Sequence, residues 1–158
     1  MVKTPPEMAQ VWLWLEEVFD PEIPALSVVD LGIVRNIAWK DDELVVTVTP
    51  TYSGCPATEV IAADIRDELR KRGFDQVRLE TKISPAWTTD WITERGRRRL
   101  REYGIAPPAT GLVQIDNVAC PHCGSHDTET ISRFGSTPCK SIYRCRACLE
   151  PFDVFKRH

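Results

Sequence analysis

The cysteines are the residues of this sequence whose spacing most directly implies chemistry. Cys120 and Cys123 are separated by two residues, and Cys145 and Cys148 repeat that spacing. Two residues between thiolates allow one tight turn to present both sulfur atoms to the same cation, and two such turns complete a tetrahedral site. The stretch 124–144 between the pairs is slightly longer than usual, and a hairpin with its loop at FGSTPCK accommodates the extra length. The four cysteines therefore predict a structural zinc site.

The sequence also allows iron in place of zinc, and it allows more than one role for the histidines and the cysteine near the site. A rubredoxin-like iron site uses the same ligand spacing, but the second cysteine pair is followed by Leu149 where the first is followed by Gly124, which favours zinc. His122 and His126 are spare ligands that we expect to be exposed loop residues. Cys139 is expected to be a small half-buried residue, with a substitute ligand or a redox thiol as the alternatives.

Cys55 stands apart from the other cysteines, between Gly54 and Pro56. If Pro56 opens a helix, Cys55 lies at the helix N-terminus, where unpaired N–H groups and the helix dipole favour the thiolate. This placement suits a reactive or metal-binding thiol, and the alternative is a buried inert cysteine. A cysteine hydrolase is not expected, because its base is usually a histidine and every histidine lies in or after the C-terminal module.

Acidic and hydroxyl side chains flank the segment that carries Cys55. The stretch DPEIPALSVVDLG contains Asp20, Glu22 and Asp30, and the strand expected before Cys55 ends at Thr49. A thiolate together with carboxylates can bind a transition metal transiently. The alternative is that Asp-Pro-Glu only ends a helix and begins a turn.

The hydrophobic pattern predicts the elements that would position these residues. A helix over 8–19 has its apolar face at Met8, Trp12, Leu15 and Phe19, and it ends before Pro21. Alternating apolar residues predict strands over 33–39 and 44–49, with a polar turn at 40–42, and a third strand over 76–83.

Two further helices are expected. The first begins at Pro56, ends at Gly73 and carries an apolar stripe at i,i+4 spacing: Ala57, Ile61, Ile65 and Leu69. The second is a basic helix that Thr89 or Asp90 caps and that ends near Gly104.

The composition changes along the chain and predicts two domains. Residues 106–116, in and after GIAPPATG, read as a linker of prolines and small residues. Residues 1–105 then form an α+β domain, a small mixed sheet with flanking helices, and residues 117–158 form a small zinc-ribbon β module. So short a module cannot bury enough apolar surface by itself and needs a metal staple.

The bulk composition limits the function classes. The chain is 42% hydrophobic and 27% charged, which is typical of a globular protein, and its net charge of -3 argues against a general nucleic-acid binder. The N-terminus lacks the pattern of a signal peptide, and no apolar run approaches the roughly 20 residues that span a bilayer. We therefore expect a cytoplasmic protein without membrane attachment, in which cysteine pairs more often hold metal than form disulfides.

The segment WTTDWITERGRRRLR concentrates tryptophan and arginine. A helix would bring Arg95, Arg98 and Arg99 near one another, next to Trp91 and preceded by Trp87. A solvated basic face is the first interpretation, and a docking surface for an acidic partner protein is the second, because Trp and Arg are frequent interface anchors. Nucleic acid is the third, and the acidic overall charge argues against it.

Three stretches of the sequence resemble the MIP18-like family (DUF59), whose members assist iron–sulfur cluster assembly: DPEIPALSVVDLGIV, VTVTPTYSGCPATEV and SPAWTTDWITERGRRRLREYGIAPP. With the C-terminal CPHCGS…STPCKSIYRCRACLEPFDVFK attached, the resemblance narrows to the PaaD (also called PaaJ) subgroup and covers nearly the whole chain. Asp-Pro-Glu-Ile-Pro and Gly-Cys-Pro mark the family, and Trp-Thr-Thr-Asp-Trp with the ribbon marks the subgroup.

This resemblance implies site residues, partners and cargo. The family's functional cysteine falls on Cys55, and its motif acid and threonine fall on Asp30 and Thr49. The subgroup is encoded with the phenylacetyl-CoA epoxidase of aerobic phenylacetate degradation, whose di-iron oxygenase and iron–sulfur reductase components are the implied partners. A non-catalytic maturation subunit that handles a transient iron or iron–sulfur cluster is the expected function. A purely structural or docking subunit, a zinc-ribbon nucleic-acid binder and a homo-oligomer remain open alternatives.

Overall fold

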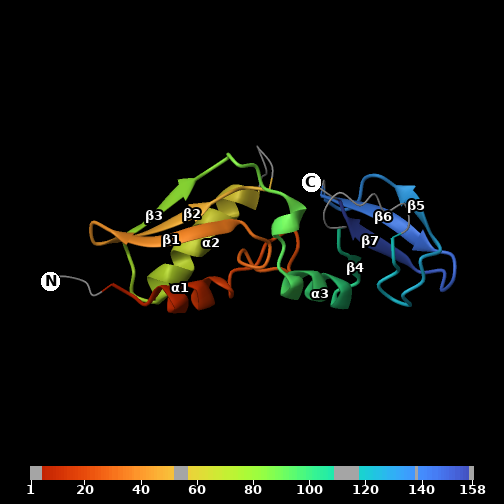
Figure 1. Cartoon of the computed structure of the whole chain (residues 1–158), viewed down its shortest axis with the longest axis horizontal. Coiled ribbons are helices and arrows are strands. Elements are labelled where there is room, and N and C mark those ends of the chain that lie inside the picture. The colour runs from red at the N-terminus through yellow and green to blue at the C-terminus, as the bar shows by residue number, and fades with distance from the viewer. Residues whose placement is uncertain (1–4, 52–56, 109–117, 138, 157–158) are drawn as a thin grey trace. The chain divides into compact units, whose positions relative to one another are not determined.

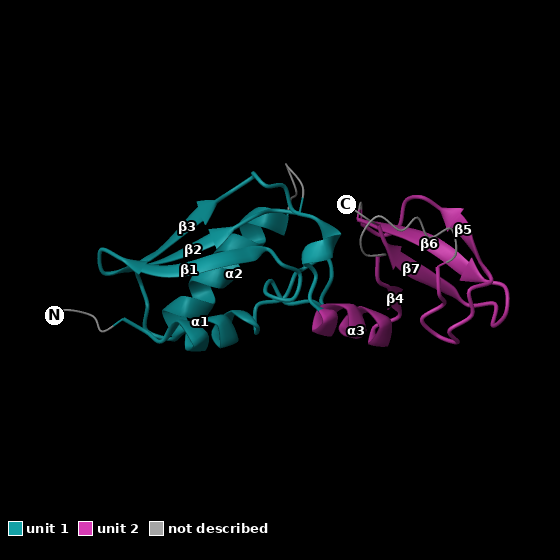
Figure 2. Ribbon diagram, viewed as in Figure 1, with its two compact units in different colours: residues 1–93 teal, residues 94–158 magenta. Residues whose placement is uncertain are grey.

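The computed structural model describes residues 5–51, 57–108, 118–137 and 139–156. The chain forms two compact units, Met1–Thr93 and Glu94–His158 (Figure 2). The sequence placed residues 94–105 in the first domain, whereas the second compact unit of the structure begins at Glu94. The folding domains predicted from the sequence, 1–105 and 117–158 with a linker between them, stay a prediction.

The first unit is a two-layer α+β structure, as predicted. Its sheet has the order β1-β2-β3, in which β1 and β2 are antiparallel and β2 and β3 are parallel. The two helices α1 and α2 cover one face of this sheet (Figure 1). Its elements are α1 Met8–Leu15, β1 Val34–Lys40, β2 Glu43–Val48, α2 Ala57–Lys71, β3 Val77–Thr81 and the 3₁₀ helix η1 Thr89–Trp91.

The hairpin of β1 and β2 agrees with the predicted strands to within a residue or two. Asp41 and Asp42 form its two-residue turn with φ of 51° and 62°, a left-handed conformation that aspartate tolerates. Every residue of β2 from Leu44 to Val48 is buried, and β2 is the central strand of the sheet. This strand leads directly to Thr49.

The helix α2 provides the crossover that the parallel pair β2 and β3 requires. Its predicted stripe is confirmed: Ala57, Ile61, Ile65 and Leu69 are all buried. Gly73, with φ of 96°, ends the helix as predicted, and the N–H of Phe74 returns to the carbonyl oxygen of Leu69 over 3.0 Å.

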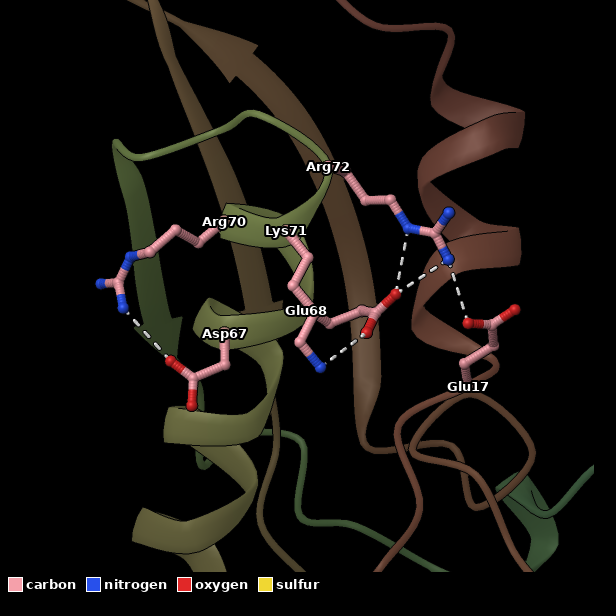
Figure 3. Close-up of polar contacts among 6 residues, drawn as sticks. All are labelled: Glu17, Asp67, Glu68, Arg70, Lys71 and Arg72. Carbon is pink, nitrogen blue, oxygen red and sulfur yellow. Dashed lines mark hydrogen bonds and ion pairs between the residues drawn. The ribbon is translucent and has the colours of Figure 1, made fainter.

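The side chain of Arg72 links the ends of the two helices (Figure 3). One of its guanidinium nitrogens lies 3.0 Å from a carboxylate oxygen of Glu17, just after α1, and 3.0 Å from one of Glu68 in α2. The guanidinium also lies 5.7 Å from the centre of the Trp14 ring in α1. These exposed contacts each contribute a fraction of a kcal/mol, on the order of 0.5 kcal/mol.

The prediction for the end of the first helix was wrong. The helix ends at Leu15, and Val11 and Leu15 are its buried residues. The chain then turns, since the N–H of Val18 bonds to the carbonyl of Leu15 and Phe19 forms an isolated bridge with Ser27. Phe19 is consequently 45% exposed, although the sequence placed it on the buried helix face.

Two other predicted boundaries also differ. The strand β3 ends at Thr81 because its partner β2 ends at Val48, opposite Thr81, so Ile83 lies outside the sheet and is 73% exposed. The predicted basic helix is split into η1 and α3 (Glu94–Glu102) by extended backbone at Ile92. The residue before η1 is Thr88, whose hydroxyl accepts the N–H of Asp90 at 3.3 Å.

The described residues of the second unit form a β module and the helix α3. Its sheet has the order β4-β7-β6-β5, and only the pairing of β4 with β7 is parallel. A small core of Ala106, Cys120, Cys145, Phe152 and Val154 lies within it. Its strands are β4 Ile105–Ala106, β5 Thr128–Ser132, β6 Lys140–Cys145 and β7 Pro151–Phe155.

Across the described parts of both units, no helix combines the length and the apolar composition needed to cross a membrane.

Candidate functional site

The structure brings the four paired cysteines together at one end of the second unit. The Sγ atoms of Cys120 and Cys148 lie 3.8 Å apart, and those of Cys123 and Cys145 lie 3.5 Å apart. All four sulfur atoms lie within 4.8 Å of one another. Four zinc–sulfur bonds of about 2.3 Å in a tetrahedron place the sulfur atoms about 3.8 Å apart. The cysteines therefore form a site that fits a single metal ion.

Two loops of the same design, which we call the metal knuckles (120–125 and 145–150), carry these ligands. In the first knuckle, the N–H of Cys120 donates to the carbonyl of Ser125 over 2.8 Å. In the second, the N–H of Cys145 donates to the carbonyl of Glu150 over 3.0 Å. Each knuckle is therefore closed by its own backbone, and the strands around it bring the two knuckles face to face.

Backbone N–H groups point at the sulfur atoms inside both knuckles. The N–H of His122 lies 3.4 Å from the Sγ of Cys120, and the N–H of Cys148 lies 3.5 Å from the Sγ of Cys145. Several hydrogen bonds, of which the one from the N–H of Cys148 is the strongest, lower the pKa of the Cys145 thiol to about 7, because they favour the thiolate. A hydrogen bond from the N–H of Glu150 acts in the same direction on Cys148, but burial and the neighbouring cysteine side chains outweigh it and raise the pKa of the Cys148 thiol to about 12. The cluster by itself therefore does not favour the thiolate at every ligand. A thiolate is the form in which cysteine binds a metal.

The residue after the second cysteine of each knuckle was used above to favour zinc over iron, and the structure does not support that argument. Gly124 has φ of 79°, and Leu149 adopts nearly the same conformation with φ of 67°. The missing glycine therefore does not change the backbone of the second knuckle. Because the two knuckles have matching backbones, Leu149 gives no reason to prefer zinc over iron.

Among the described residues of the second unit, His122, His126 and Cys139 contribute no ligand atom to this cluster. His122 and His126 are exposed loop residues, as expected. Cys139 is 6% exposed, and its Sγ lies 3.0 Å from the hydroxyl of Thr137. The sequence predicted it to be half-buried, and the structure places it in the interior.

Two of the acidic residues that the sequence predicted for a site, Asp20 and Asp30, have hydrogen-bond partners within the first unit. Asp20 is 6% exposed, and its Oδ1 accepts the N–H groups of Glu22 at 2.8 Å and Ile23 at 3.1 Å. It therefore caps the turn that follows Pro21, which is the turn-forming role that the sequence left open. Glu22 itself is half-buried.

Asp30 lies in the turn Ser27–Gly32 and is 1% exposed. Its N–H donates to the hydroxyl of Ser27 over 3.0 Å, and its Oδ1 accepts the hydroxyl of Thr93 over 2.8 Å. Sequence reasoning did not find Thr93, because no local pattern connects two residues that are 63 positions apart.

Thr49 is 2% exposed, and backbone hydrogen bonds connect it to the segment that follows this turn. Its N–H donates to the carbonyl of Ile33 over 2.8 Å, and the N–H of Ile33 donates to that of Val28 over 3.1 Å. Thr49 and Asp30 thus belong to neighbouring segments. Cys55 lies outside the described residues, and its predicted role stays a prediction.

The tryptophans and arginines of the predicted docking surface differ in exposure. Trp87 is 5% exposed, and its Nε1 donates to the carbonyl of Leu31 over 2.9 Å, which makes it a packing residue of the first unit. Trp91 is half-buried beneath the guanidinium of Arg35, 3.8 Å from its ring centre. In α3, Arg98 is exposed and Arg95 and Arg99 are half-buried. Docking through these residues stays a prediction.

An open groove of about 500 Å³ runs between the end of α1 and one side of α2. Most of the charged side chains along it pair with one another, including Asp67 with Arg70 at 3.2 Å (Figure 3). None of the described residues that the sequence predicted for a site lines it.

Comparison with known proteins places this arrangement in a class. Residues 8–77 match the family described as iron–sulfur cluster assembly protein, and residues 105–156 match the family described as PaaD zinc beta ribbon domain. A DUF59 domain from Bacillus anthracis has the same fold, with a TM-score of 0.54 at 24% identity, over 58% of this chain and 89% of that one. The chain is thus an iron–sulfur cluster assembly domain joined to a zinc β ribbon.

A relative that covers nearly the whole chain defines the family more closely. An Escherichia coli protein, named as one of the subunits of a "Putative 1,2-phenylacetyl-CoA epoxidase", is 49% identical, over 96% of this chain and 94% of that protein. The chain therefore belongs to the PaaD family. An "Fe-S protein maturation auxiliary factor" of Porphyromonas gingivalis is 34% identical, over 54% of this chain and 83% of that protein.

Proposed function

We propose that this protein assists the assembly of an iron–sulfur cluster or iron centre in a phenylacetyl-CoA epoxidase, as a non-catalytic accessory subunit. The observation that carries the proposal is the union, in one chain, of an iron–sulfur cluster assembly domain and a PaaD zinc ribbon. The name of the Escherichia coli relative supports the epoxidase, and the name of the Porphyromonas gingivalis relative supports maturation. The oxygenase and reductase components of the epoxidase are the proposed partners.

Cys55 is the proposed working residue of the first unit. A thiolate is a strong ligand for iron and for the irons of a cluster, and in the sequence Cys55 follows β2, which ends at Val48 beside Thr49. Iron, alone or in a cluster, is the cargo that this thiolate receives and passes on.

Zinc is the proposed resident metal of the second unit. The four sulfur atoms have the spacing of a closed tetrahedral site, in which every ligand comes from the chain. Such a site holds the two knuckles together and leaves no open coordination position for a substrate. Its contribution is therefore to the folding of the ribbon.

The test is the iron and acid-labile sulfide content of the oxygenase and reductase, produced with the wild-type chain, with Cys55→Ala or without the chain. Maturation through Cys55 predicts equal losses of iron in the last two cases. Cys139→Ala serves as the matched control, because it removes a thiol that lies outside the four-cysteine cluster. Equal iron content in all samples would exclude a maturation role.

A structural component of the epoxidase complex is the second candidate, and the name of the Escherichia coli relative, which makes it one of the epoxidase subunits, favours it. This function predicts a stable complex with the oxygenase that Cys55→Ala does not affect. Co-purification of the complex, compared with its iron content, separates the two candidates.

A further inference from the structure

The segment Trp87–Thr93, which we call the strap, is fixed at both ends to two consecutive residues of the first unit. At its beginning, the indole Nε1 of Trp87 donates to the carbonyl of Leu31 over 2.9 Å. At its end, the N–H of Thr93 donates to the carbonyl of Asp30 over 2.8 Å, and the hydroxyl of Thr93 donates to Asp30 Oδ1 over 2.8 Å. Of these three bonds, only the one from the hydroxyl of Thr93 goes to the carboxylate of Asp30.

The middle of the strap lies directly on Gly32. A methyl group built at Gly32 would lie 2.7 Å from both the Cβ and the carbonyl oxygen of Trp91, so the contact requires a residue without a side chain. Gly32 also has φ of 81°, which other residues rarely adopt. On the other side, the guanidinium of Arg35 lies 3.8 Å from the centre of the Trp91 ring.

The strap lies between the two stretches that match known families, which end at residue 77 and begin again at residue 105. Its contacts nevertheless involve Asp30, the acid to which the family resemblance assigns a functional role. A carboxylate that is 1% exposed and bonded to a hydroxyl is poorly placed to bind a metal from solution. Binding a metal through Oδ1 would compete with the bond from Thr93.

We propose that Asp30 is a positioning residue, which holds the strap closed over Gly32 through Thr93, and that it is not a ligand for iron. The inference rests on the proposed function only in that iron is taken as the cargo. A positioning role requires a hydrogen-bond acceptor at Oδ1 and does not require a negative charge. Asparagine keeps the acceptor and removes the charge, which separates the two roles.

The first experiment is amide hydrogen exchange of the strap in the full chain. Thr93→Val and Asp30→Ala should each lower the protection of Trp91, Ile92 and Thr93 by about tenfold, because each removes the bond between the Thr93 hydroxyl and the buried Asp30 carboxylate. Thr93→Ser and Asp30→Asn should keep protection within about threefold of the wild type. Asp42→Asn is the control, since it removes an exposed acid from a turn where asparagine is tolerated.

Unchanged protection in Thr93→Val would overturn the proposal, and so would equal losses in Thr93→Ser and Thr93→Val. These two variants decide the question even if Asp30→Asn does not fold. The double variant Asp30→Ala with Thr93→Val should lose less protection than the sum of the two single losses, because both single variants remove the bond between the Thr93 hydroxyl and Asp30 Oδ1.

The second experiment is titration with ferrous iron. Asp30→Asn should bind iron within about threefold of the wild type, whereas loss of a metal ligand lowers affinity by about tenfold or more. A tenfold loss with the strap still protected would make Asp30 a ligand and overturn the inference. If the wild type binds no ferrous iron, the cargo is not free ferrous iron, and the exchange measurements alone decide the role of Asp30.

Discussion

Cys123 and Cys145 come from different metal knuckles, yet their Sγ atoms lie only 3.5 Å apart. Cys123 is exposed, whereas Cys145 is buried in the small core of the second unit. A bound metal therefore joins a surface loop to that core.

Replacing Cys123 with serine should remove this link. For structural zinc, metal binding contributes on the order of 10 kcal/mol to folding, so the loss of one thiolate should strongly lower both metal content and the melting temperature of the second unit. Metal analysis and amide exchange of β6 and β7 measure these effects. His122→Ala, an exposed change in the same knuckle, should have neither effect. An unchanged melting curve in Cys123→Ser would contradict the metal staple.

Gly32→Ala should destabilise the first unit by about 1–3 kcal/mol, since the new methyl group overlaps Trp91 and the backbone is left-handed. Urea unfolding followed by tryptophan fluorescence measures the change, because every tryptophan lies before residue 94. Gly73→Ala is the matched control: its φ is 96°, but a methyl group there meets nothing within 4 Å. It should cost about 1 kcal/mol. Equal losses of unfolding free energy in Gly32→Ala and Gly73→Ala would mean that the strap moves away from the new methyl group at little cost.

Leu149→Gly should keep the metal and leave the ribbon as stable as the wild type or more stable. The left-handed backbone of Leu149 costs about 1–2 kcal/mol, and the side chain is 61% exposed, so little burial is lost. The greater freedom of glycine in the unfolded chain offsets about 1 kcal/mol of the gain. Leu149→Ala keeps the strained backbone and should show no gain. Thermal unfolding of the metal-bound protein compares the two, and a large loss in Leu149→Gly would give the leucine side chain a role of its own.

Cys55→Ala should leave the melting temperature within a few degrees of the wild type, because the predicted role of this thiol is chemical. Circular dichroism during heating provides the measurement. Ile65→Ala gives the scale of a true core deletion, since Ile65 is fully buried and such a change typically costs about 2–5 kcal/mol. A loss of similar size in Cys55→Ala would identify Cys55 as a core residue.

The sequence predicted the features that depend on regular spacing. The stripe of α2 and the pairing of the four cysteines follow from periods of a few residues, and the structure has both. The end of α1 was not predictable in this way, because Phe19 continues the helical period while the chain turns to bridge Ser27. That bridge depends on the folded turn and leaves no mark in the apolar pattern.

The partners of the site residues were also beyond sequence reasoning. Asp30 was singled out as an acid near a cysteine, but its bond to Thr93 joins segments that are distant in the chain. The left-handed backbone of Leu149 was missed for a different reason. Residue type indicates which backbone conformations are favourable. The closed second knuckle requires a left-handed conformation, which is unfavourable for leucine.

The short strand β4 has a consequence for isolating the ribbon. Ile105 and Ala106 pair with Asp153 and Val154, so β4 covers the outer side of β7. A fragment cut at residue 117 would leave that edge of β7 bare, and unpaired strand edges promote self-association. A fragment that begins at Glu94 keeps the covering strand and the helix before it. We expect the longer fragment to remain monodisperse at concentrations where the shorter one aggregates, which light scattering can measure.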